Sequence, residues 1–224
     1  MLNDCAVIFE KSLPFWDKLN EEHKKLLCTQ TSLAEYDKGE NIHGTSGNCT
    51  GALLVKSGLL RIYMLSDEGK EITLYRLYPG DICMLSASCV LDTITFEVLA
   101  DAETRSEVYI ISSGAFSRVM EENVYAENFA LKKATERFSE VMWAMQQILF
   151  MSFDRRLAVF LLGELAKNGD DAVKLTQEQI AKYMGSAREV VSRMLKYFST
   201  EGLVEVTRGG VKILDKKRLQ IIAG

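Results

Sequence analysis

The chain has 224 residues, of which 47% are hydrophobic and 26% are charged, and it carries a formal net charge of −4. This length accommodates one large domain or two small ones. There is no run of 18 apolar residues, and the start lacks a basic segment followed by an apolar block. We therefore expect no membrane span and no signal peptide, and predict a cytoplasmic protein.

The cysteines do not predict a disulfide framework, because their number is odd and they are widely spread in a chain expected to be cytosolic. Most of them are expected to be small buried apolar residues. They are Cys5, Cys28, Cys49, Cys83 and Cys89.

The first predicted element is a short helix with Asn20 as its N-cap and glutamates in its first turn. From about residue 33 to residue 111 the pattern changes to short strands. Apolar and polar positions alternate in "GLLRIYML" and "EITLYRLY", and the intervening "SDEG" predicts a turn with Gly69 at positive φ. Many short strands separated by glycines predict a sandwich or barrel, in a domain covering residues 1–124.

A long helix without Pro or Gly is predicted from Tyr125 to Met151. Its apolar residues recur at heptad spacing, which fits either packing on the barrel or pairing with a second copy of the chain. Phe129, Met142 and Leu149 widen the apolar surface, so both contacts are compatible. We predict a dimerisation helix at residues 125–152, with an interface formed by Leu131, Ala134, Phe138, Val141, Met145 and Ile148.

A third region, residues 153–224, begins with a helix that Ser152 or Asp154 can cap. It contains 13 Lys and Arg against 9 Asp and Glu, a net charge of +4 in an otherwise acidic chain. A basic module suits a partner that carries phosphates.

Within this region the sequence predicts a helix-turn-helix. Thr176 and Gln179 have capping-box spacing, Gly185 forms the turn, and Ser186 is the expected N-cap of the second helix. Glu189 and Arg193 are spaced to form an i,i+4 pair. Inward positions of the second helix are Val190 or Val191, Met194 or Leu195, and Phe198.

The following "LVEVTRGGVKILD" predicts a hairpin with Gly209 and Gly210 as its turn, which is the wing of a winged helix. The predicted fold class is therefore α+β: a jelly-roll-like double-stranded β-roll, a long dimerisation helix and a winged helix-turn-helix. No enzyme is predicted, because the chain has only two histidines and lacks the usual nucleotide-binding and hydrolase motifs. A small-molecule-binding dimeric module without DNA activity is the remaining alternative.

Double-stranded DNA is the expected partner, because arginine can contact guanine edges and glutamate can accept from cytosine in the major groove. Lys196 and Arg208 are suited by type to phosphates. The predicted DNA-binding residues are Thr176, Gln177, Ser186, Arg188, Glu189, Ser192, Arg193, Lys196 and Arg208.

Almost the whole chain resembles the Crp/Fnr family of bacterial transcription regulators. "GLLRIYMLSDEGKEITLYRLYPGDI" resembles the family's sensor β-roll, and "GSAREVVSRMLKYFSTEGLV" is similar to its DNA-recognition segment. The resemblance implies a homodimer, an effector-controlled arrangement of the DNA-binding domains and RNA polymerase as a partner. It also implies a palindrome with half-sites similar to TGTGA or TTGAT, with Arg188, Glu189, Ser192 and Arg193 at base-contacting positions.

Departures from the family pattern bear on the effector. "CMLSAS" and "TITFE" stand where the cyclic-nucleotide branch has its ribose- and phosphate-binding residues, and Cys5 is alone where the iron–sulfur branch has a cysteine group. We therefore expect neither cyclic AMP nor an iron–sulfur cluster. Two alternatives stay open: haem, for which Cys83 matches a ligand but Leu85 replaces the histidine, and redox sensing through Cys83 and Cys89.

The predicted effector pocket is mostly apolar and holds a small ligand that is not strongly anionic. Its expected residues are Cys83, Ser86, Thr95 and Met142.

Overall fold

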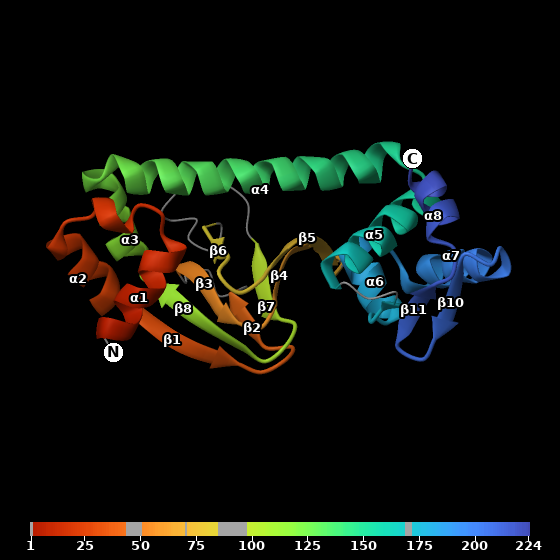
Figure 1. The fold of residues 1–224 in the computed structure, drawn as a ribbon, viewed down its shortest axis with the longest axis horizontal. Coiled ribbons are helices and arrows are strands. Elements are labelled where there is room, and N and C mark those ends of the chain that lie inside the picture. Colours follow the sequence, from red (N-terminus) through yellow and green to blue (C-terminus); the bar gives the residue numbers. More distant parts are fainter. Residues whose placement is uncertain (1, 44–50, 70, 85–97, 169–171) are drawn as a thin grey trace. The chain divides into compact units, whose positions relative to one another are not determined.

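The computed structural model describes residues 2–43, 51–69, 71–84, 98–168 and 172–224 (Figure 1). Its contacts divide the chain into two compact units. The first, here called the roll unit, contains Met1–Met64 and Leu74–Val141. The second, the C-terminal unit, contains Leu65–Thr73 and Met142–Gly224.

The roll unit is built on two four-stranded sheets, with strand orders β1-β8-β3-β6 and β2-β7-β4-β5. The pairs β1–β8, β3–β8, β3–β6, β2–β7 and β4–β7 are all antiparallel. The strands are β1 Thr31–Tyr36, β2 Asn41–His43, β3 Ala52–Ser57, β4 Leu60–Leu65, β5 Glu71–Leu77, β6 Ile82–Cys83, β7 Leu99–Ala102 and β8 Ser106–Ile111. As predicted, Gly69 lies between β4 and β5 at φ +77°.

Short helices gather at one end of the sheets (Figure 1). They are α1 Leu2–Ser12, the 3₁₀ helix η1 Trp16–Lys18, α2 Glu21–Thr29 and α3 Ser113–Glu122. Asn20 caps α2 as predicted, because its side chain accepts a 2.7 Å hydrogen bond from the His23 N–H. The sequence interpretation did not include α1.

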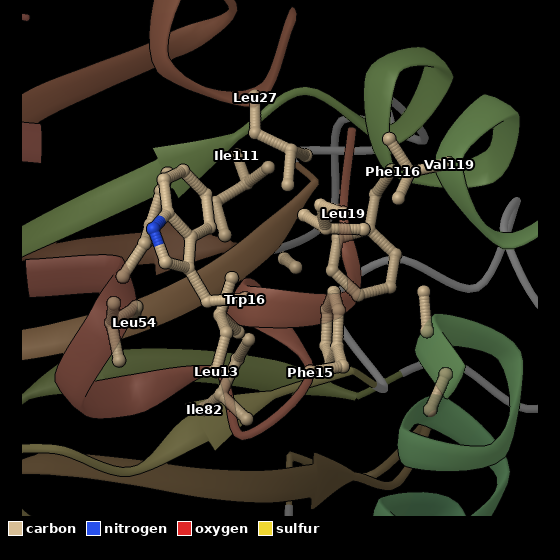
Figure 2. Packing of buried hydrophobic residues seen from close by; sticks show 14 of the residues in the cluster. Leu13, Phe15, Trp16, Leu19, Leu27, Leu54, Ile82, Ile111, Phe116 and Val119 are labelled. Atoms are coloured by element: carbon tan, nitrogen blue, oxygen red, sulfur yellow. The ribbon is translucent and has the colours of Figure 1, made fainter. Parts of the chain in front are cut away.

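An aromatic core joins these helices to the first sheet (Figure 2). The rings of Phe9 and Trp16 are 5.5 Å apart, and Phe15 meets Phe116 edge-on at 6.4 Å. Aromatic pairs of this kind contribute beyond the area they bury. This core therefore attaches the short helices to the roll.

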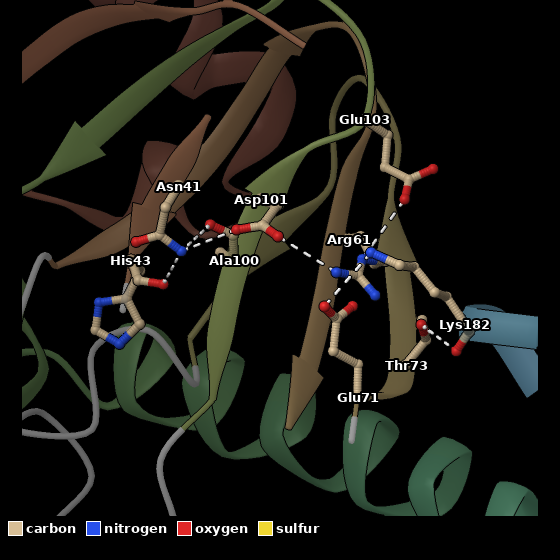
Figure 3. A network of polar contacts seen from close by, with 9 residues as sticks. All are labelled: Asn41, His43, Arg61, Glu71, Thr73, Ala100, Asp101, Glu103 and Lys182. Carbon is tan, nitrogen blue, oxygen red and sulfur yellow. Dashed lines mark hydrogen bonds and ion pairs between the residues drawn. The ribbon is translucent and has the colours of Figure 1, made fainter. Parts of the chain in front are cut away.

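Arg61 is a buried charge in the second sheet and is only 3% exposed. Its guanidinium lies 3.3 Å from Asp101 and 3.5 Å from Glu103, and it stacks on the Tyr63 ring at 4.0 Å. Asn41 donates to the other Asp101 oxygen at 2.8 Å, so the network joins β2, β7 and β4 (Figure 3). Removing one partner from a buried ion pair of this kind is costly, because the remaining charge is left poorly compensated.

Helix α4 spans Val124–Phe150, close to the predicted bounds. Ala126 and Ala130 are fully buried against the roll, and Ala134 also packs on that core. Ala134 therefore contributes to the roll's core, although the heptad pattern placed it in the open seam. The exposed apolar residues of α4 include Leu131, Phe138, Met142, Met145, Ile148 and Leu149.

The C-terminal unit combines helices with a three-stranded sheet in the order β10-β11-β9. Its hydrophobic core includes residues such as Leu161, Val191, Phe198 and Val211, and Glu164 of α5 is buried as well. The elements are α5 Phe153–Asn168, β9 Ala172–Val173, α6 Gln177–Met184, α7 Arg188–Thr200, β10 Val204–Thr207, β11 Gly210–Ile213 and α8 Lys216–Ala223. Neither β9 nor α8 was predicted.

In the part of the chain that the structure describes, no helix combines the length and apolarity required to cross a bilayer.

Candidate nucleic-acid interface

The interface begins at the capped N-terminus of α6. Thr176 Oγ1 accepts from the Gln179 N–H at 3.2 Å, and Gln179 Oε1 accepts from the Thr176 N–H at 2.9 Å. This reciprocal pair confirms the predicted capping box. It fixes where α6 starts, with Thr176 exposed and Gln177 half-buried.

The turn between α6 and α7 depends on Gly185, which has φ +57° and ψ +43°. This left-handed conformation costs glycine little and other residues more. The Ser186 N–H then bonds to the Ala181 carbonyl at 2.9 Å, closing α6 in a Schellman-type arrangement. Arg156 of α5 donates to the Met184 carbonyl at 2.6 Å and so ties the same helix end to the core.

The N-cap of α7 is Ala187, with no side-chain cap, and the prediction of Ser186 as N-cap is wrong. The physical reason is that Ser186 already belongs to the C-terminal closure of α6, so α7 begins one residue later. The inward positions are Val191, Leu195 and Phe198, all fully buried. The opposite face of α7 is thereby directed to the outside.

That outer face carries four exposed charged residues: Arg188, Glu189, Arg193 and Lys196. The predicted ion pair between Glu189 and Arg193 is not formed. None of the four side chains makes a hydrogen bond or ion pair with another residue in the described part of the chain. Ser192, between them, is half-buried. The donors and acceptors on this face are therefore available to an external partner.

The wing is the β10–β11 hairpin, in which Thr207 pairs with Gly210. The two-residue turn is thus Arg208–Gly209, with Gly209 at φ +95°, rather than the predicted Gly209–Gly210. Gly210 belongs to β11, where an added Cβ would lie 2.8 Å from the Val173 carbonyl oxygen. Arg208 is exposed at the tip.

A polar hollow of about 400 Å³ lies between the start of α6, the start of α7 and the wing. It brings together three of the predicted DNA-binding residues, Thr176, Gln177 and Arg188. Its wing residues Thr207, Gly209 and Gly210 were not in the predicted DNA-binding set. Backbone N–H groups at a helix start and an arginine favour an anion, whereas Glu178 at the rim opposes one. The lining residues are Leu175, Thr176, Gln177, Glu178, Arg188, Thr207, Gly209 and Gly210.

The predicted effector residues are only partly described. Cys83 is fully buried in the roll, and its Sγ lies 3.5 Å from the Tyr75 hydroxyl. Met142 is 45% exposed on α4. Ser86, Thr95, Leu85 and Cys89 lie outside the described residues, so the pocket stays a prediction. Among the residues that are described, no group of three or more His, Cys, Asp or Glu could hold a metal ion.

A helix-turn-helix followed by a hairpin wing, with a basic outer helix face, defines a winged-helix nucleic-acid-binding module. Here it follows a β-roll and a long helix on the same chain. This combination defines the class of DNA-binding regulators that carry a separate sensor domain.

Comparison with known proteins agrees with both assignments, the N-terminal sensor domain and the C-terminal DNA-binding module. Residues 33–123 match the cyclic nucleotide-binding domain family, and residues 155–222 match the Crp-like helix-turn-helix domain family. The chain is 30% identical over 198 residues to the transcriptional activator protein FnrA of Stutzerimonas stutzeri, covering 84% of this chain and 78% of FnrA. It is 25% identical over 214 residues to the cyclic AMP receptor protein of Thermus thermophilus, covering 95% and 98%.

A crystal structure of a Crp/Fnr-family protein from Eubacterium rectale is also similar, with 45% identity and a TM-score of 0.88, over 95% of this chain and 98% of that one. The chain belongs to the Crp/Fnr family of transcription regulators. It is a DNA-binding transcription regulator with an effector-type N-terminal domain, as the sequence predicted.

Proposed function

We propose that the protein acts as a homodimer that binds a palindromic operator through α7 and the wing, under control of a small effector held by the roll unit. The observation that carries this proposal is the outer face of α7. Four charged side chains stand there without partners in the described chain, next to the wing. Their placement on one face beside the wing, in the basic part of an otherwise acidic chain, supports a phosphate-bearing partner.

The residue types assign roles on this face. Arg188 and Arg193 can each donate two hydrogen bonds to a guanine edge, and Glu189 can accept from a cytosine amino group. Lys196, Arg208 and the start of α6, with Thr176 and Gln177, suit phosphates, which position the module without specifying sequence. Ser186 and Ser192 complete the proposed contact set.

Dimerisation through α4 explains the large apolar residues exposed on that helix. Phe138 is 65% exposed and Leu149 is 67% exposed, and side chains of this size are normally buried or covered by a partner. A parallel pair of such helices would present two copies of α7 about 34 Å apart, which matches successive major grooves on one face of DNA. Leu131, Val141, Met145 and Ile148 belong to the same proposed interface.

Control by an effector follows if the ligand binds one arrangement of the DNA-binding modules more tightly than another, because only such a difference shifts the population. RNA polymerase is the proposed partner on the promoter, and the cytoplasm is the proposed location. The proposed role is regulation and not catalysis.

The test is fluorescence anisotropy with the full-length protein and a labelled duplex carrying inverted TTGAT half-sites. The control duplex has the same composition with both half-sites scrambled. We expect tighter binding to the palindrome, a steep loss of affinity with added salt and a stoichiometry of two chains per duplex. Equal affinity for both duplexes at every salt concentration would overturn the proposal.

A further inference from the structure

The sequence did not predict the surroundings of Arg137 in the roll unit. It projects from α4, and its side chain is only 14% exposed. The guanidinium stacks on the ring of Tyr75 from β5, with 4.5 Å between the guanidinium carbon and the ring centroid. Tyr75 in turn reaches Cys83 of β6 through the 3.5 Å contact of its hydroxyl. Helix α4 and strand β5 therefore meet at this guanidinium, and Tyr75 links the pair to β6.

The hydrogen bonds of Arg137 are incomplete. Its Nη1 donates to both oxygens of Glu140, at 2.9 and 2.7 Å. Its Nε is buried and has no partner among the described residues. Burying such a donor without an acceptor costs free energy, so an unpaired one in a folded protein calls for a physical reason.

Arg61 of the same unit differs from Arg137 in how deeply its carboxylate partners are buried. It is held between two largely buried carboxylates, Asp101 and Glu103, whose side chains are 21% and 16% exposed. Among the described residues, the carboxylate that accepts hydrogen bonds from Arg137 belongs to Glu140, whose side chain is 47% exposed, and Asp81 adds an electrostatic attraction. Arg137 thus has the features of a cation whose permanent partner is weakly held.

We propose that Arg137 binds the negatively charged end of the effector, and that the effector is a small carboxylate. The proposal rests on the proposed function of the roll unit as an effector-binding domain, and it revises the expectation of a ligand that is not strongly anionic. The planar guanidinium matches a carboxylate in shape and can donate two parallel hydrogen bonds to it. One cation balances one negative charge, which favours a carboxylate over a phosphate dianion.

Tyr75 gives the site a second recognition element. Burial, followed by the neighbouring Cys83, raises the pKa of the Tyr75 phenol well above its ordinary value. The hydroxyl therefore stays neutral and can donate a hydrogen bond at neutral pH. The ring meanwhile holds the guanidinium plane in a fixed orientation, which reduces the entropy lost when a ligand binds.

Because Arg137 is a residue of α4, a ligand bound to its guanidinium would contact that helix directly. Arg137 precedes Phe138, the exposed apolar residue of the proposed dimer interface, by one position. A carboxylate that displaces Glu140 from Arg137 changes the charge pairing on α4 itself. The ligand would thereby act on the helix through which the two subunits are proposed to meet.

The experiment measures thermal unfolding of the full-length protein in the presence of acetate, pyruvate, benzoate, succinate and 2-oxoglutarate. Each carboxylate is compared with its uncharged amide, and inorganic phosphate is included. The variants are Arg137→Gln, which removes the charge, and Arg137→Lys, which keeps the charge but loses the planar fork. Lys132→Gln is the matched control, because it removes one charge from an exposed position of the same helix.

We expect at least one carboxylate to raise the wild-type unfolding temperature while its amide does not. Arg137→Gln should weaken the apparent Kd for that carboxylate by about tenfold or more, because a hydrogen-bonded charge is lost. Arg137→Lys should retain part of the response, and Lys132→Gln all of it. The partial response of the lysine variant also separates ligand recognition from a general folding defect.

The proposal is overturned if no carboxylate in this set stabilises the wild type, if the amides act equally, if phosphate acts more strongly, or if Arg137→Gln responds like the wild type. DNA binding by the same samples is measured separately with the palindromic duplex. Stabilisation by a carboxylate without any specific DNA binding would contradict the proposed regulator and leave the ligand assignment standing. Specific DNA binding without a carboxylate response would contradict the ligand assignment and leave the proposed regulator standing.

Discussion

The Nε2 atom of His23 lies 2.8 Å from Oε2 of Glu122, and this contact joins α2 to the last residue of α3. The His23 side chain is 4% exposed, whereas that of Glu122 is 48% exposed. Arg118 approaches the other Glu122 oxygen at 3.1 Å and also reaches Glu22 of α2 at 2.9 Å. The pair and its arginine thus hold two helices together immediately before α4 begins.

Replacing Glu122 with Gln should lower the stability of the roll unit at neutral pH. The hydrogen bond from His23, and next that from Arg118, lowers the pKa of Glu122 below its ordinary value of 4.5. A carboxyl group with a lowered pKa stabilises the fold above its ordinary pKa, and that stability is lost as pH falls through the folded value. The wild type should therefore lose more stability between pH 6 and pH 3 than Glu122→Gln does.

Urea unfolding at a series of pH values measures this difference. Glu121→Gln is the matched control, because Glu121 is the adjacent exposed glutamate and makes no ion pair in the described structure. An identical pH dependence for wild type and Glu122→Gln would contradict the assignment.

Alanine at Gly58 should destabilise the protein much more than alanine at Gly39. Both glycines have a left-handed backbone, with φ +91° and +90°. That conformation alone costs alanine about 1–2 kcal/mol. A Cβ at Gly58 would also lie 2.6 Å from the Arg105 carbonyl oxygen, whereas nothing lies within 4 Å of one at Gly39. We expect an additional loss of about 1–3 kcal/mol for Gly58→Ala, because the backbone must shift to relieve the overlap.

Thermal and urea unfolding of the two variants would give the comparison directly. Because the backbone penalty is shared, the difference between them isolates the steric overlap. Equal destabilisation would mean that the turn after β3 adapts to a side chain.

Arg193→Ala should weaken binding to the palindromic duplex by about 1–3 kcal/mol and relax the preference for one base pair, if Arg193 contacts a base. Lys196→Ala should weaken binding to specific and scrambled duplexes alike, and reduce the slope of log K against log salt by about 1. Anisotropy titrations over a range of salt concentrations separate the two behaviours. The assignment of Arg193 fails if its variant loses affinity for both duplexes in the same proportion.

Phe138→Glu should weaken the dimer, because it places a charge at an exposed apolar position of α4 that is proposed to meet the partner subunit. Lys132→Glu is the control: it introduces the same residue on the same helix, about 120° around the axis from Phe138. Sedimentation equilibrium measures both association constants. A dimer equally strong in Phe138→Glu and wild type would place the interface elsewhere.

The C-terminal module could be predicted from sequence because its signals are local. The capping box of Thr176 and Gln179 and the glycine turn at Gly185 are each determined within a few residues, and the structure has both. The turn residues of "SDEG" and the cap at Asn20 are further examples. Family membership rested on similarly contiguous segments.

Tertiary structure decided what depends on residues distant in sequence. Ser186 is a residue type that N-caps favour, yet its N–H closes α6 on the Ala181 carbonyl, beside the Met184 carbonyl to which Arg156 of α5 donates. A heptad pattern places Ala134 in an apolar stripe but does not say whether the roll or a partner covers it.

The pairing of Arg137 with Tyr75 could not be predicted from the sequence. A helix residue and a strand residue 62 positions apart are in contact, and no spacing rule connects them. Local propensity and capping act between neighbours in the chain. Which face is buried, and which charge is left without a partner, is determined only when the sheets and helices pack.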